Sequence, residues 1–178
     1  YYYRVLALDN DQNQSEPTEA VISRPVTLNN GILIVDESVD GPGTSPFQPT
    51  DAMVDGFFAG LMDNFETHDL DMAQHSESLR LRDIGIYSAI LWHGIDTSDI
   101  TSPYSIREDL ARYLELGGNI LYTGYQPSLA FGMNDGYPAT FAADSYLYEV
   151  LGISEANFNT QSRFRYAQPM VDDLPALE

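Results

Sequence analysis

Three runs of consecutive apolar residues restrict the folds open to this chain more than any other feature of its sequence. They cover residues 32–35, 88–92 and 120–122, and polar residues follow each of them directly. The runs lack the alternation of a strand with one face in water, so they are typical of parallel strands covered on both faces. Residues 67–72 are more polar and do alternate, which favours an edge position in the same sheet.

Helical patterns separate these predicted strands. Behind a Thr-Asp cap, apolar residues recur at the spacing of one helix face: Val54, Phe57, Phe58, Leu61, Met62 and Phe65. A capping box of Ser105 and Glu108 predicts a second helix that ends at Gly117, and residues 138–151 predict a third. The alternation predicts an α/β fold with a doubly wound, mainly parallel sheet, right-handed crossovers and a flavodoxin-like strand order.

The first 26 residues have a different pattern. Residues 1–8 and 20–26 are two extended segments around a polar turn, and together they predict a β-hairpin. The motif Tyr-x-Tyr-Arg-Val-x-Ala-x-Asp and the later Ser-Glu-Pro-Thr-Glu resemble the last two strands of a fibronectin type III domain. A two-stranded hairpin is marginal in water by itself. We therefore expect residues 1–26 to pair with another chain in a strand-mediated homodimer, to pack on the α/β domain or to be poorly ordered.

The rest of the chain carries a second resemblance. Residues 31–37, 87–94 and above all 110–124, with Leu-x-x-Tyr-Leu-x-x-Gly-Gly-Asn-Ile-Leu-Tyr-Thr-Gly, are similar to the class I glutamine amidotransferase-like superfamily. The form it resembles occurs beside fibronectin type III modules in large secreted bacterial proteins. The resemblance implies an amidotransferase-like α/β domain over residues 31–175, other domains of a parent protein as partners, and a secreted or cell-surface location.

The residues that catalytic members of that superfamily use are missing here. The resemblance places their nucleophilic cysteine in the elbow at residues 124–128, but the chain has no cysteine, and no histidine follows His93. Without a cysteine thiolate as nucleophile and a histidine as its base, the covalent intermediate of these enzymes cannot form. We therefore expect amidotransferase chemistry to be absent. Ser128 with His93 as its base is a weaker alternative, because a structural serine explains that position as well.

Ligands of doubly wound sheets bind at the carboxyl ends of the strands. The sequence therefore predicts these ligand-cleft residues: Asp36, Glu37, His93, Asp96, Thr123, Tyr125 and Gln126. The acidic members are similar to the magnesium pocket of receiver domains, but the chain has no lysine, which phosphotransfer in that family needs.

A second site hypothesis concerns the loop after the first strand. Asp36, Glu37 and Asp40 precede a Gly-Pro-Gly turn and offer oxygen ligands for Ca²⁺ or Mg²⁺. A solvated acidic loop without a metal explains the same residues. His68 and His75 have no helical spacing to each other or to His93 that would indicate a zinc site.

Aromatic residues gather after the third apolar run. They are Tyr122, Tyr125, Phe131 and Tyr137. Exposed rings beside an acidic rim would suit a carbohydrate or peptide ligand, and core packing is the alternative.

Charge and composition narrow the classes of function. The chain has 27 acidic residues against 8 arginines, with a formal net charge of −19, so it should repel nucleic acid. No apolar run approaches the ~20 residues of a membrane span, and we expect no membrane insertion. The sequence favours a non-catalytic binding or structural module of a secreted or cell-surface multidomain bacterial protein. The alternative is a hydrolase or metal-dependent enzyme that uses the strand-end residues.

Overall fold

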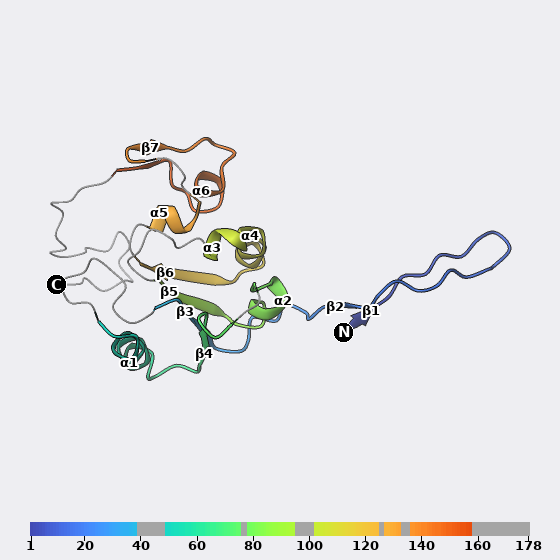
Figure 1. The fold of residues 1–178 in the computed structure, drawn as a ribbon, viewed down its shortest axis with the longest axis horizontal. Helices are drawn as coiled ribbons and strands as arrows, with labels where there is room; N and C mark the ends of the chain where they lie inside the picture. Colours follow the sequence, from blue (N-terminus) through green and yellow to red (C-terminus); the bar gives the residue numbers. More distant parts are fainter. Residues whose placement is uncertain (39–48, 76–77, 95–101, 125–126, 133–135, 158–178) are drawn as a thin grey trace. The chain divides into compact units, whose positions relative to one another are not determined.

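The computed structural model describes residues 1–38, 49–75, 78–94, 102–124, 127–132 and 136–157. Contacts divide the chain into two compact units, Tyr1–Asn134 and Asp135–Glu178. The parallel sheet belongs to the first unit (Figure 1). None of the described helices is both long and apolar enough to cross a lipid bilayer.

Four parallel strands form the central sheet. They are β3 (Ile32–Asp36), β4 (Thr67–Asp71), β5 (Ala89–His93) and β6 (Asn119–Thr123). Their order is β4-β3-β5-β6, and β4 lies at an edge, as its alternation predicted. The central strands β3 and β5 are buried from their second residue onward. This arrangement confirms the predicted α/β fold with a parallel sheet.

One face of the sheet is covered by α1 (Asp51–Leu61), and α4 (Arg107–Glu115) lies on the opposite side (Figure 1). Phe58 of α1 is buried in a cluster with Ile34 of β3 and Leu91 of β5, and Val54 and Met62 pack against that cluster. The i, i+4, i+8 row of α1 therefore holds the helix to the sheet.

The apolar face predicted for α1 is wider than the face that the structure buries. Phe57 is 64% exposed and Leu61 is 55% exposed, and Phe65 lies beyond the end of the helix. Phe57 directly precedes Phe58, and Leu61 directly precedes Met62. One position along a helix corresponds to a rotation of about 100° around its axis, which turns both exposed side chains away from the sheet. Of the predicted apolar face, the row of Val54, Phe58 and Met62 packs against the sheet.

The other face is covered by α4 (Arg107–Glu115), in which Leu110 and Tyr113 are buried. The Tyr113 hydroxyl donates a hydrogen bond of 2.9 Å to the carbonyl of Tyr87, just before β5. A Cβ atom on Gly118 would lie 2.2 Å from the Tyr113 ring, so this glycine allows the ring its place.

Three short helices complete the first unit: α2 (Leu81–Ile84), α3 (Ser102–Ser105) and α5 (Pro127–Ala130). The predicted capping box at Ser105 is wrong. Ser105 ends α3, and α4 starts at the next turn with Ile106 at its N-cap and no side-chain cap. Ser105 thus lies at a helix boundary, as predicted, but it ends the preceding helix.

The second unit corrects the helix predicted over residues 138–151. Only α6 (Tyr146–Glu149) is helical there, and β7 (Ala139–Thr140) pairs antiparallel with β8 (Glu155–Ala156). The Ser145 hydroxyl accepts a hydrogen bond from the backbone N–H of Tyr148. This cap starts the helix at the serine, several residues later than predicted.

At the N-terminus, β1 (Tyr2–Tyr3) pairs antiparallel with β2 (Val21–Ile22). Leu8 and Gln14 form a bridge nearer the turn. Every residue from 1 to 25 is exposed. The relation of this segment to a fibronectin type III domain, and its pairing with another chain, stay predictions.

Candidate functional site

A cavity of about 360 Å³ opens at the carboxyl ends of β3 and β5, beneath the first turns of α1. It is lined by Ile34, Asp36, Asp55, Gly56, Phe58, Ala59, Asp69, Asp71, Gln74 and His93. Four of these residues are aspartates, and none of the described lining residues is an arginine or a lysine. The cavity is therefore an acidic cleft at the edge of the sheet where ligands of doubly wound folds bind.

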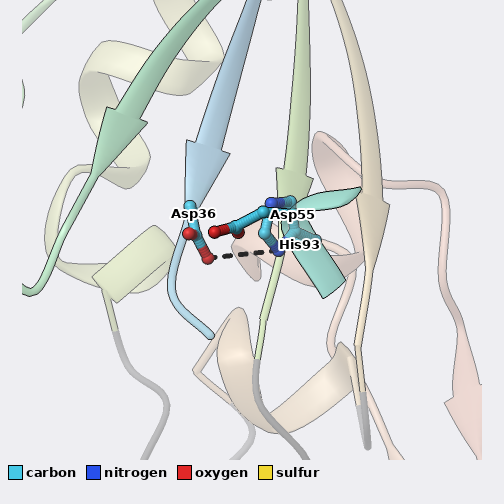
Figure 2. Close-up of side chains that lie close together, drawn as sticks. All are labelled: Asp36, Asp55 and His93. Atoms are coloured by element: carbon cyan, nitrogen blue, oxygen red, sulfur yellow. Dashed lines mark ion pairs between the residues drawn. The ribbon is translucent and has the colours of Figure 1, made fainter. Parts of the chain in front are cut away.

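Two side chains of the cleft come from adjacent central strands. Asp36 ends β3 and His93 ends β5, and the two residues are partners in the parallel register. Because register partners point to the same face, the side chains meet, with 3.3 Å between His93 Nδ1 and Asp36 Oδ1 (Figure 2). Asp36 is 7% exposed and His93 is 2% exposed. The sheet thus buries a carboxyl group and an imidazole in contact.

The imidazole of His93 is held by packing. Its ring stacks on Phe58 of α1 with 4.3 Å between ring centroids and 12° between ring planes. Nδ1 is buried and has no hydrogen-bond partner in the part of the chain that the structure describes, because its approach to Asp36 lacks hydrogen-bond geometry. Burial lowers the pKa of His93, although Asp36, Asp51 and Asp69 oppose that shift. The lowered pKa favours the neutral imidazole, in which one of the two ring nitrogens carries a lone pair.

Asp55 is the third member of the cluster. It projects from α1 toward the other two side chains (Figure 2), and ligand atoms of Asp36, Asp55 and His93 all lie within 4.8 Å of one another. Desolvation, a hydrogen bond with Asp36 and repulsion from Asp36 raise the pKa of Asp55 to about 6. Asp51 and Asp71 add smaller repulsions. The cluster concentrates negative charge without a positive partner.

Ser38 supports the carboxylate of Asp36. Its backbone N–H donates to Asp36 Oδ1 over 2.7 Å, and its hydroxyl lies within hydrogen-bond distance of both Asp36 Oδ1 and Asp51 Oδ1. One hydroxyl has one proton, so it donates to only one of these carboxylates at a time. The side chain of Asp36 is oriented by this contact, while the acceptors of the site still outnumber the donors.

The structure brings together only some of the predicted cleft residues. Asp36 and His93 line the cavity, and Thr123 ends β6 as the register partner of His93. Glu37 accepts a hydrogen bond of 2.8 Å from Trp92 Nε1. Asp40, Asp96, Tyr125 and Gln126 lie outside the described residues.

Asp36 and Glu37 point in different directions. Successive strand residues point to opposite faces, and Trp92, which Glu37 contacts, lies on the face opposite His93. The combination of Asp36, Glu37 and Asp40 proposed from the sequence thus has its first two members directed to different faces.

Sequence reasoning missed Asp55, Asp69 and Asp71. A signal for each was present. Asp55 lies three residues before Phe58, so it falls near the helix row that faces the sheet. Asp69 and Asp71 are two residues apart on one strand and therefore point to the same face.

Two of the predicted aromatic residues pack together. Tyr122 and Phe131 meet edge to face, with ring centroids 5.1 Å apart, and Phe131 is buried. Desolvation and the charge of Glu37 raise the pKa of Tyr122 to about 12. This pair favours the core-packing interpretation. Tyr137 belongs to the second unit, and Tyr125 lies outside the described residues.

The raised pKa of Asp55 predicts a stabilising substitution. The folded state holds a proton on Asp55 up to about pH 6, whereas an ordinary aspartic acid loses it near 3.8. The folded state therefore binds more protons in this range, and its stability falls as pH rises from about 4 to 6. We expect metal-free Asp55→Asn to be more stable than the wild type above pH 6, by on the order of 1 kcal/mol because Asp55 is exposed.

Urea unfolding at pH 4 and pH 7.5 measures this difference. The gain should be small at pH 4, where both proteins are neutral at this position. The matched control is Asp63→Asn, which removes the same charge outside the cavity. An equal gain from both substitutions at pH 7.5 would contradict a local cause.

Comparisons of the chain with protein-family models, with curated proteins and with solved structures found no match.

Proposed function

We propose that the chain is a non-catalytic binding module of a secreted or cell-surface multidomain bacterial protein, and that its α/β domain binds a cationic ligand in the acidic cleft. The observation that carries this proposal is the lining of the cavity, with four aspartates and neither arginine nor lysine among the described positions. Such a surface attracts cations and repels phosphates and carboxylates. A basic peptide or a metal ion fits this charge, and a carbohydrate fits through its hydroxyl donors.

Topology supports the location of this site. If the four parallel strands are numbered in chain order, the sheet order is 2-1-3-4. This order agrees with the flavodoxin-like and amidotransferase-like assignments that we propose for the domain. The crossovers on either side of β3 and β5 depart to opposite edges of the sheet, so Asp36 and His93 end the strands at a topological switch point.

A second candidate is a metal-dependent hydrolase. The convergence of Asp36, Asp55 and His93 favours it, because coupled carboxyl and imidazole groups are a common setting for metal-activated water. Turnover of a neutral nitrophenyl ester that requires added metal and disappears in Asp55→Asn would favour the enzyme over the binding module.

Titrations with charged probes test the binding module. We expect hexaamminecobalt(III), an exchange-inert trication, and a triarginine peptide to shift the amide NMR signals of the residues that line the cleft. Citrate should not shift them. The double variant Asp69→Asn/Asp71→Asn should bind both cations several-fold more weakly, since it removes two cleft charges.

The matched control is Asp11→Asn/Asp63→Asn, which has the same net charge and leaves the cleft intact. If both double variants weaken binding equally, or if the shifts scatter over the whole surface, the chain attracts cations only through its net charge and the proposal fails.

A further inference from the structure

We propose that Asp36, Asp55 and His93 form a binding site for a divalent first-row transition metal ion of the zinc class. This inference rests on the proposed function, since it names the cation that the acidic cleft takes. Its three ligands come from β3, α1 and β5, so a bound ion would join the helix to the two central strands.

The spacing of the ligand atoms fits a metal ion. Two ligands at ~2.1 Å from a tetrahedral ion lie about 3.4 Å apart. The distance between His93 Nδ1 and Asp36 Oδ1 is 3.3 Å, without hydrogen-bond geometry between them. Asp55 completes a group whose atoms lie within 4.8 Å of one another. An ion among the three atoms would need only small side-chain movements.

The buried nitrogen of His93 is an independent indication. Its side chain is 3% exposed, its ring borders the cavity, and among the described residues Nδ1 has no hydrogen-bond partner, only the approach of Asp36 Oδ1. A buried polar atom without a partner is costly and uncommon, and it calls for an explanation such as an ion. A metal ion between the side chains would accept the lone pair of Nδ1, which lies toward Asp36 (Figure 2).

The donor set selects the kind of metal. One imidazole with two carboxylates suits Zn²⁺ and its first-row neighbours, whereas Ca²⁺ takes six to eight oxygen ligands and Mg²⁺ takes oxygen ligands in an octahedron. Three protein ligands leave a coordination position toward the cavity. Asp69, Asp71 and Gln74 line that side and offer acceptors and a donor to a metal-bound water.

The surroundings already orient the ligands. Phe58 fixes the plane of the imidazole by stacking, and Ser38 fixes the Asp36 carboxylate through its backbone N–H. Such supporting contacts are typical of metal sites, because they hold the ligands in position before the ion arrives.

Calorimetric titration of metal-free protein without a polyhistidine tag tests the site. At pH 7.5 and constant ionic strength, we expect one Zn²⁺ per chain, bound at least tenfold more tightly than Ca²⁺ or Mg²⁺. His93→Ala and Asp55→Asn should each weaken Zn²⁺ binding at least tenfold. His68→Ala and His75→Ala are the matched controls, since they remove an imidazole elsewhere, and both should bind like the wild type.

Asp55→Asn keeps the test decisive if His93→Ala does not fold, because Asp55 is exposed and its neutral form should not destabilise the domain. Zn²⁺ binding that persists in Asp55→Asn, or that is lost in His68→Ala, overturns the metal site. If hexaamminecobalt(III) or triarginine binds the cleft while Zn²⁺ shows no preference over Ca²⁺, the metal site fails and the cationic binding module stands. If none of these probes binds, both fail.

Discussion

Replacing Gly31 with alanine is expected to remove about 2–4 kcal/mol from the unfolding free energy of the α/β domain. Gly31 has a φ of +68°, a conformation that costs an L residue ~1 kcal/mol. A Cβ atom there would lie 2.4 Å from the carbonyl oxygen of Glu66. Such overpacking costs a further ~1–3 kcal/mol.

The neighbours of Gly31 cannot move away easily. The Glu66 carbonyl accepts the hydrogen bond of Ile32 that begins the pairing of β3 with β4. The Gly31 carbonyl itself accepts from the backbone N–H and the hydroxyl of Ser88, at the start of β5. Relief of the clash would therefore disturb the start of three strands.

Urea unfolding followed by the fluorescence of Trp92 measures this loss, since Trp92 is the single tryptophan of the chain and is buried. The matched control is Gly60→Ala in α1, where an added Cβ meets nothing within 4 Å. It should stabilise the helix by ~0.5–1 kcal/mol. If Gly31→Ala unfolds at the same urea concentration as the wild type, residue 31 does not need to be glycine and the explanation is wrong.

The sheet was predictable because its signals are local. The runs at residues 32–35 and 88–92 are apolar without alternation, and each became a central strand. The strand ends then placed Asp36 and His93 at one edge, since parallel strands end together. The opposite directions of Asp36 and Glu37 follow from strand alternation alone, and the sequence hypothesis overlooked this rule.

The sequence places Asp55 near the helix row that faces the sheet, but it does not show that this side chain reaches Asp36 and His93. Whether Asp55 reaches the strand ends depends on the rotation of α1 about its axis. Packing of Phe58 on His93, Ile34 and Leu91 fixes that rotation, and these contacts join segments more than 20 residues apart. The same packing leaves Phe57 and Leu61 exposed, which the helix pattern did not distinguish from Phe58. Two predicted helix starts were also wrong. Ser105 ends α3 and does not begin α4, and Ser145 caps α6 several residues after the predicted start.

Zinc is expected to raise the thermal midpoint of the domain far more than calcium does. A ligand that binds only the folded state stabilises it by RT ln(1 + [L]/Kd), which is about 2.7 kcal/mol when free metal is one hundred times Kd. For a chain of this size that corresponds to about 5–10 °C. The measurement is a thermal melt of metal-free protein with added ZnCl₂ or CaCl₂, each compared with NaCl at the same ionic strength. Salt alone should stabilise the protein, because it screens a net charge of −19.

Two substitutions distinguish the proposed metal site of Asp36, Asp55 and His93 from the hypothesis of a metal in the acidic loop after β3. Asp36 belongs to both, so Asp36→Asn cannot distinguish them. Glu37→Gln should leave the zinc effect intact, because Glu37 contacts Trp92 on the other face and its amide oxygen can still accept that hydrogen bond. Asp55→Asn should abolish the zinc effect, because it removes a ligand of the triad. If calcium instead gives the larger shift and Glu37→Gln removes it, the ion binds through the loop after β3 and the triad is not the metal site.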